Sequence, residues 1–220
     1  MLSGSIKGRR SISSFTSEKV DLDIIDELIS VSGYAPSSCD TQPWFFLVFH
    51  SGESKEKLNA YIRRGYECMN QDLKGKHKVL GSVYKKLLNF FSVYGKFDDA
   101  PVLILLFAKP YDTVLFSQAI KFAQNEKIQN IADGSVKTSA ALAMQNFLLL
   151  AHEKGLGTRV KDGMKFLVSF ETLKSEFYNE FQIPKEYQLL SGIQLGYPTK
   201  EALLRTAPKR LSLDQVRRII

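Results

Sequence analysis

Tyr34 to Phe49, YAPSSCDTQPWFFLVF, joins a polar turn to an apolar run. Pro36 and Pro43 lack an amide hydrogen and disfavour helix at the residues before them, so a preceding helix has to end here. The run from Phe45 to Phe49 is aromatic and branched, which predicts a short buried strand rather than a half-exposed one. The polar turn has two interpretations of similar weight, an ordinary helix-to-strand connection and a ligand-binding loop.

Two further stretches predict strands that pair with the first one. Residues 102–109, VLILLFAK, are apolar on both faces of a strand, so we expect a central strand there. Tyr187–Leu195, YQLLSGIQL, is the third predicted strand. Helical periodicity and end signals predict helices at Val20–Ser32, Ser54–Gln71, Lys78–Tyr94, Tyr111–Ile131, Asp133–Lys154 and Val168–Phe181, and a short last helix containing Arg217 and Arg218.

The long helix that begins at Asp133-Gly134-Ser135 has the clearest predicted ends. Ser135 is its expected N-cap, and Gly155 is its expected left-handed stop. Between Ala140 and Ala151 nearly every position is apolar, which predicts burial on most sides, either in the core or at a subunit interface. Three strands among six or seven helices predict a single α+β domain over residues 1–220, with helices on both faces of one sheet.

Composition narrows the class of protein. The 220 residues are 44% hydrophobic and 24% charged, as in ordinary globular proteins. The two cysteines, Cys39 and Cys68, have no Cys or His at metal-ligand spacing, so we predict no disulfide framework, no metal site and a reducing, cytoplasmic compartment. No run approaches the ~20 apolar residues of a membrane span. The basic, serine-rich start MLSGSIKGRRSISSF is faintly like a transit peptide, and its apolar positions make no helical stripe.

The chain carries an excess of positive charge. Its net charge is +7 and its pI is near 9.3, values that suit a polyanionic partner. The cations are scattered among acidic residues, however, and no nucleic-acid-binding motif is present. We therefore expect neither a nucleic acid nor a membrane partner, and take the excess as weak support for a small anionic ligand.

Four separated motifs carry the chemical signal. In chain order they are Arg9-Arg10-Ser11-Ile12-Ser13, Ala35-Pro36-Ser37-Ser38 with Gln42-Pro43-Trp44, Gly155-Leu156-Gly157 with Asp162-Gly163, and Pro208-Lys209-Arg210. In this order and at these distances the chain resembles the nitroreductase family of FMN-dependent oxidoreductases, over nearly its whole length. The two glycines of Gly155-Leu156-Gly157 do not form a dinucleotide fingerprint, because they follow a helix rather than a strand and a third glycine is missing.

Basic residues near the two ends of the chain suit the phosphate of FMN. This phosphate is a dianion, and guanidinium groups bind such anions best, so Arg9 and Arg210 are the first candidates to hold it. The resemblance implies that Arg9, Arg10 and Ser11 bind the phosphate and the ring edge. It also implies that Lys209 and Arg210 close over the phosphate.

The resemblance implies that two other motifs contact the flavin ring. It implies that the backbone amides of Asp162 and Gly163 face flavin N5, the atom that accepts and passes on hydride, and a glycine lets the backbone approach a flat ring. It implies that Pro36, Ser37 and Ser38 meet the flavin of a partner subunit.

Two positions depart from the family pattern. Asp40 stands where the family usually has asparagine, and Ser13 stands where a basic residue is common. Both positions, with Gln42, remain predicted FMN contacts. Each departure removes a donor or a positive charge that would favour reduced flavin, so it weakens FMN binding, alters the flavin potential, or marks a specialised subfamily.

The resemblance also implies the architecture and the assembly. We expect a single central sheet, mixed but mostly antiparallel, with helices on both faces. We expect an intertwined homodimer with the active site at the subunit interface, a lid or substrate-pocket region at about 75–131, and a C-terminal arm at about 199–220.

The expected activity is a flavin-mediated hydride transfer. NADH or NADPH would reduce N5 of FMN, leave, and be replaced by a small electron-poor acceptor such as a nitroaromatic or a quinone. The alternatives are a specialised flavin enzyme of the dehalogenation or desaturation type, and a flavin- or anion-binding protein with little turnover. The three histidines, His50, His77 and His152, lie apart without a paired acid or serine, and hydride transfer itself needs no side-chain acid or base.

Overall fold

A computed structural model describes residues 2–74, 100–111, 126–204 and 206–220, together with single residues 83, 86 and 118. Four antiparallel strands form its sheet, in the order β1-β2-β4-β3. Their bounds are Trp44–Phe49 for β1, Val102–Ala108 for β2, Gly157–Lys161 for β3 and Gln188–Gly196 for β4. The predicted central strand is β2, and all seven of its residues are buried.

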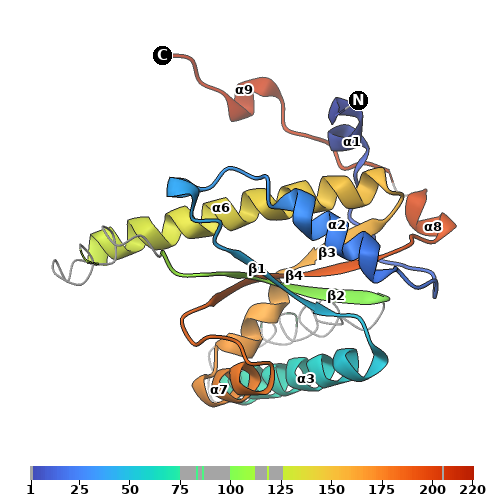
Figure 1. The fold of residues 1–220 in the computed structure, drawn as a ribbon. Coiled ribbons are helices and arrows are strands. Elements are labelled where there is room, and N and C mark those ends of the chain that lie inside the picture. The colour runs from blue at the N-terminus through green and yellow to red at the C-terminus, as the bar shows by residue number, and fades with distance from the viewer. Residues whose placement is uncertain are drawn as a thin grey trace.

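Helices cover both faces of the sheet, which confirms the predicted α+β fold (Figure 1). One face carries α2 (Leu22–Ser32) and α6 (Glu126–Glu153), and the other carries α3 (Gly52–Lys74), the 3-10 helix η2 (Asp162–Val168) and α7 (Glu171–Glu180). Side chains of β2 alternate between the two layers, because neighbouring residues of a strand point to opposite faces. Leu103, Leu105 and Phe107 enter the core beneath α3 and α7, whereas Val102 and Ile104 enter the core beneath α2 and α6.

The long helix α6 differs from its prediction at its start and agrees with it at its end. It begins at Glu126, and the predicted cap Ser135 lies inside it, where its hydroxyl donates to the carbonyl of Ile131 at 3.0 Å. Serine can satisfy its hydroxyl in this way within a helix, so it is a weak boundary signal. Gly155 has φ of 78°, as expected for a left-handed stop.

The N-terminal segment adds to the outer edge of β3. A short helix, α1 (Leu2–Gly8), precedes it, although no helical stripe was visible in the sequence. The amide of Ile12 then donates to the carbonyl of Thr158 at 2.9 Å, and Ser11 forms a parallel bridge with Thr158. A Cβ on Gly157 would lie only 2.7 Å from Ile12, so this close approach needs a glycine.

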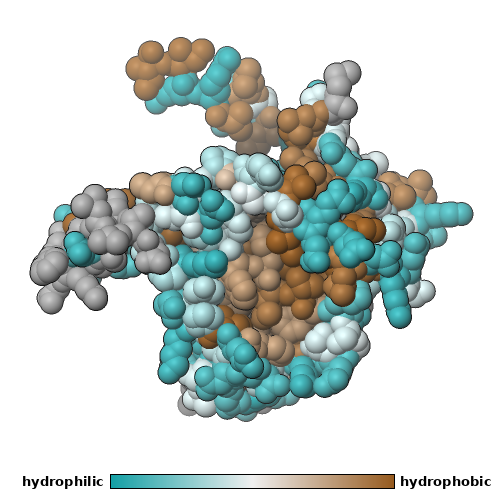
Figure 2. All heavy atoms as spheres, in the orientation of Figure 1, coloured by the Kyte–Doolittle hydropathy of each residue, from teal (hydrophilic) through white to brown (hydrophobic). Residues whose placement is uncertain are grey.

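The C-terminal arm (residues 199–220) leaves the body of the protein and runs near α1 (Figure 1). It holds α8 (Lys200–Leu203) and α9 (Leu213–Val216). Arg217 and Arg218 follow α9 rather than lying in it, which corrects the prediction. Apolar side chains of the arm are exposed, as Figure 2 shows. The same view shows a separate apolar area on the body of the protein, over β1.

Three other predictions need correction, and two lie outside the described residues. A fourth strand, β3, had no signal because its sequence GTRVK is mostly polar. The strand β1 is half-buried at five of its six positions because it lies at an edge of the sheet. The last predicted long helix starts at Glu171 rather than Val168. The predicted helix Lys78–Tyr94 and residues 112–125 of Tyr111–Ile131 lie almost entirely outside the described part, and with them most of the predicted lid.

We expect Gly157→Ala to destabilise the protein by about 1–3 kcal/mol, because the added methyl group would displace Ile12 from the edge of β3. The free energy of unfolding in urea measures this change. The matched control is Gly134→Ala within α6, where a new Cβ meets nothing within 4 Å. This control should be neutral or stabilising, since alanine favours helix. Equal effects of the two substitutions would contradict the close packing of Ile12 on β3.

Candidate functional site

Arg9 and Arg210 affect each other electrostatically although they are far apart in the sequence. Arg9 is half-buried, and the pKa of its guanidinium is lowered by burial, then by the positive charge of Arg210, and then by that of Arg10. Two cations that repel each other at a partly buried position are favourably placed to share an anion. In the structure the charge of Arg210 thus acts on Arg9, the other residue that the sequence predicted for the phosphate.

Arg10 has a second, local role. Its Nη1 atom donates to the carbonyls of Lys7, Gly8 and Arg9, at 2.5, 3.1 and 2.9 Å. These contacts satisfy carbonyl groups at the end of α1, where a helix leaves its last carbonyls without partners. Arg10 thus fixes the direction in which the chain leaves α1 towards β3.

A hollow of about 330 Å³ lies beside the two N-terminal arginines. Arg9 and Arg10 form one side of it, and the other side is formed by the end of α6 at His152 and the residues from Gly155 to Thr158 that lead into β3. Of the neighbouring predicted contacts, Ser11 is exposed at the outer edge of β3 and Ser13 is half-buried. Lys209, predicted to act with Arg210, is exposed on the arm.

The Asp162-Gly163 pair follows β3 directly and opens η2, so it lies at a strand end rather than just after a helix. Ser11 forms an isolated parallel bridge with Thr158, and the N-terminal segment then leaves β3, because Phe15 bridges Pro198 just after β4. The strand β3 itself leads from the hollow beside the arginines, which Gly157 and Thr158 line, to the Asp162 turn. Asp162 also forms an exposed ion pair with Lys165, with 3.4 Å between Oδ1 and Nζ.

The loop of Pro36, Ser37 and Ser38 lies against the first half of α6. The amide of Ser38 donates to Oγ of Ser139 at 3.2 Å, and the Ser38 hydroxyl lies 2.9 Å from the hydroxyl of Tyr111. Pro36, Ser37 and Ser38 line an open hollow of about 450 Å³ with residues 131–142 of α6. Ser139 and Tyr111 were missed by the sequence reasoning, and no local pattern marks them, because both reach the loop from distant elements.

The same loop is held in a strained conformation. Cys39, Asp40 and Gln42 have φ of 51°, 52° and 44°, in the left-handed region that residues other than glycine seldom adopt. Two hydrogen bonds hold the turn closed: the amide of Gln42 donates to Oγ of Ser37, and Nε2 of Gln42 donates to Oδ1 of Asp40, both at 3.1 Å. Strain of this kind persists where the surroundings impose it and is concentrated at functional sites.

The two parts of the predicted site lie at different points of α6 within one chain. Pro36–Ser38 meets the helix at Ser139, and the hollow beside Arg9 meets it at His152. These positions are 13 residues apart, or about 20 Å along a helix axis. One chain therefore does not bring the Pro36–Ser38 loop to the arginine pair.

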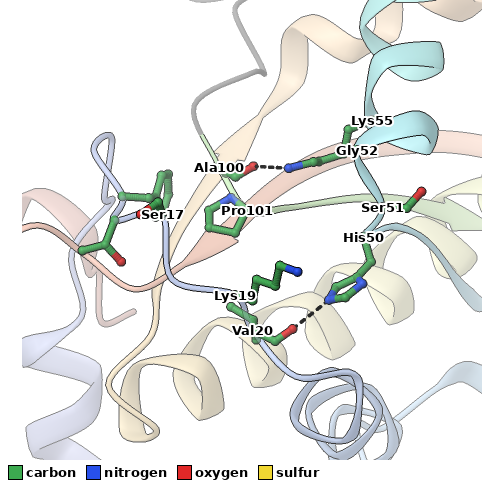
Figure 3. A pocket seen from close by; sticks show the side chains of 11 residues that line it. Ser17, Lys19, Val20, His50, Ser51, Gly52, Lys55, Ala100 and Pro101 are labelled. Atoms are coloured by element: carbon green, nitrogen blue, oxygen red, sulfur yellow. Dashed lines mark hydrogen bonds between the residues drawn. The ribbon is translucent and has the colours of Figure 1, made fainter.

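A larger hollow of about 730 Å³ contains none of the predicted contacts (Figure 3). It lies between the Phe15–Val20 segment, the junction of β1 with α3, and the start of β2. Two of its polar side chains already have a backbone carbonyl as a hydrogen-bond partner. His50 Nε2 lies 2.8 Å from the carbonyl oxygen of Val20, and Lys55 Nζ donates to the carbonyl oxygen of Ala100 at 3.5 Å. This hollow offers no group of convergent reactive side chains.

Two features are absent from the residues that the structure describes. No group of three or more His, Cys, Asp or Glu side chains could hold a metal ion. No helix in the same residues has the length and apolar character needed to cross a membrane.

Similar proteins include iodotyrosine deiodinase 1 of Homo sapiens, 29% identical over 210 residues, and that of Mus musculus, 30% identical over 214 residues. Each match covers 94% of this chain, which spans 64% and 65% of the length of these two relatives. The relatives are therefore longer proteins, to which this chain corresponds in part.

Solved structures share the fold over the whole chain. A BluB-like flavoprotein from Clostridium difficile 630 is 23% identical, with a TM-score of 0.80 and coverage of 100% of this chain and 99% of that one. A nitroreductase with bound FMN from Bacteroides fragilis is 17% identical, with a TM-score of 0.68 and coverage of 100% and 98%. An iodotyrosine deiodinase bound to FMN and 3-iodo-L-tyrosine is 24% identical, with a TM-score of 0.61 and coverage of 97% of both chains. The family model described as the nitroreductase family matches residues 6–197, and the chain belongs to that family.

Proposed function

We propose that this chain is an FMN-dependent oxidoreductase that acts on a small aromatic substrate. The observation that carries the proposal is the place of the half-buried Arg9, which is affected by the charge of Arg210. It lines a hollow at the start of β3, and this strand ends at Asp162-Gly163. A phosphate and a flat ring need these features in this order, with a cationic pocket at one end and a closely approaching backbone at the other.

The residues present fit FMN. Arg9 is half-buried, so its contact with a phosphate is less screened than that of a surface arginine. A Cβ on Gly163 would lie 2.9 Å from the Tyr66 hydroxyl, so a glycine is needed for the turn at the end of β3 to keep its position. FMN supplies the electron transfer when bound, while the protein binds it, orients it and sets the electrostatics around N5.

We further propose a homodimer in which the Pro36–Ser38 loop serves the FMN of the partner subunit. About 20 Å of α6 separates this loop from the arginine pair of its own chain. Apolar side chains that a second copy would cover are exposed around the loop, with Tyr34, Ile131 and Leu142 exposed to 87%, 63% and 42%. The exposed apolar side chains of the C-terminal arm support the same assembly (Figure 2).

The reaction that we favour is reductive dehalogenation of a halogenated tyrosine-like phenol. Similarity to iodotyrosine deiodinases over 94% of this chain supports it. In this reaction a carbon–iodine bond is replaced by a carbon–hydrogen bond, which consumes two electrons and a proton and releases iodide. The amides of Asp162 and Gly163 would stabilise negative charge that develops on the reduced flavin.

The second candidate is transfer of hydride from NADH or NADPH to a nitroaromatic or a quinone. Its support is the shared fold with nitroreductases, including a structure with bound FMN. The two candidates differ in the acceptor and in the source of electrons, so one set of assays separates them.

Purified protein incubated with FMN should retain the cofactor and show flavin absorption bands. We expect dithionite-reduced protein to convert 3-iodo-L-tyrosine to tyrosine and iodide in equal amounts, and the flavin bands to return. Rapid bleaching by NADH or NADPH, followed by reoxidation with a nitroaromatic or a quinone but not with 3-iodo-L-tyrosine, would instead favour the second candidate. Failure to take up FMN would contradict both.

Arg210→Ala should weaken FMN binding by about 1–3 kcal/mol, because it removes a charge-assisted contact to the phosphate. Titration of apo-protein with FMN, followed by quenching of flavin fluorescence, measures the change. Arg218→Ala is the matched control, since it removes the same charge from the exposed end of the same arm. A loss of the same size in both variants would show that Arg210 contributes net charge rather than a specific contact.

Asp40→Asn should raise the FMN reduction potential and tighten FMN binding by about 1 kcal/mol, because a donor replaces an acceptor beside the flavin. The asparagine Oδ1 can still accept from Gln42, so the loop geometry is kept. Asp133→Asn is the control, because Asp133 accepts an equivalent bond from Gln129 on α6 at 2.9 Å. Redox titration against dyes of known potential measures the shift, and an unchanged potential in Asp40→Asn would exclude Asp40 from the flavin site.

A further inference from the structure

The hydroxyl group of Tyr66 is buried in an unusual position beneath the Asp162-Gly163 turn. Tyr66 belongs to α3, and its hydroxyl oxygen is shielded from solvent with no hydrogen-bond partner among the described residues. A buried hydroxyl without a partner destabilises a protein relative to the same ring without oxygen. Such a group calls for an explanation other than the stability of the fold.

Gly163 lies against this oxygen. A Cβ on Gly163 would lie 2.9 Å from the Tyr66 hydroxyl, closer than real side-chain contacts allow. The φ angle of Gly163 is not in the left-handed region, whereas that of Gly155 is. Contact with Tyr66, rather than an unusual backbone angle, is thus the local reason for glycine at position 163.

The surrounding packing fixes this contact. A Cβ on Gly65, the neighbour of Tyr66, would lie 3.4 Å from the carbonyl carbon of Phe166 in η2. The rings of Tyr66 and Phe166 meet edge to face, with centroids 5.4 Å apart and planes at 63°. Burial raises the pKa of Tyr66 to about 12, so its hydroxyl is neutral at physiological pH. The turn therefore rests on a rigid, uncharged support.

We infer that Tyr66 is a positioning residue: its hydroxyl acts as a spacer beneath Gly163 and sets how closely the Asp162-Gly163 amides approach the flavin. This inference rests on the proposed function. Removal of the oxygen would leave a gap into which the turn relaxes, away from the flavin. Addition of a methyl group at Gly163 would push the turn in the other direction, and the two changes would compensate each other.

The test is a double-mutant cycle of Tyr66→Phe, Gly163→Ala and their combination, with FMN affinity and the FMN reduction potential as readouts. We expect Gly163→Ala alone to weaken FMN binding at least about tenfold, and by less than about threefold in the Tyr66→Phe background. Tyr66→Phe alone should shift the potential to a more negative value, because weaker contact with N5 stabilises the reduced flavin less.

Tyr61→Phe is the matched control, because it removes the same atom from the same helix. The Tyr61 ring packs on Phe177 and Phe181 of the core, away from the turn. This control should leave the potential unchanged. The melting temperature of the apo-proteins is measured alongside, and Tyr66→Phe should not lower it, since its hydroxyl has no described partner.

Several outcomes would overturn the spacer role. Equal losses from Gly163→Ala in both backgrounds would show that Tyr66 does not set the turn, and an unchanged potential in Tyr66→Phe would separate it from the flavin. A lower melting temperature in Tyr66→Phe would reveal a bonding partner for the hydroxyl within the fold. If the unaltered protein bound no FMN, the proposed function would fail first, and this result is distinct from the others.

Discussion

All seven side chains of β2 are buried, alternately beneath two layers of helices, and the other elements are arranged by that constraint. A strand apolar on both faces has to be covered on both sides and paired at both edges, which β1 and β4 do. β4 in turn pairs with β3, and the outer edge of β3 takes the N-terminal segment through Ile12. Each of these pairings lies one strand further from β2, and the last one fixes the N-terminal segment that contains Arg9. The position of Arg9 therefore depends on the order of the strands in the sheet.

The helix α6 sets the distance between the two parts of the proposed flavin site, the Pro36–Ser38 loop and the hollow beside Arg9. It packs on the sheet through small and apolar residues, and its length places the Pro36–Ser38 loop and the hollow beside Arg9 at separate positions. A rigid helix holds such a separation constant. The proposed site, which needs both parts, would for this reason be completed by a second copy of the chain, and the same proposal accounts for the exposed apolar side chains of the arm.

Several features of this protein follow from local sequence. The full burial of β2, the strand β4, the helices α2 and α3 and the left-handed Gly155 were predicted, because each depends on periodicity or on the conformational limits of one residue. The spacing of the four motifs predicted the family, and the family model confirms it. Charge chemistry predicted Arg9 and Arg210 for the phosphate, and this assignment stays a prediction; in the structure the charge of Arg210 acts on Arg9.

Other features were decided by tertiary structure alone. The strand β3 has a polar sequence and forms because β4 and the N-terminal segment lie beside it. The half-burial of β1 depends on its place at the sheet edge, and the start of α6 depends on packing that overrides Ser135. The contact of Tyr66 with Gly163 joins residues almost a hundred positions apart. Sequence patterns report what a residue prefers, whereas these features depend on which distant surface the folded chain brings next to it.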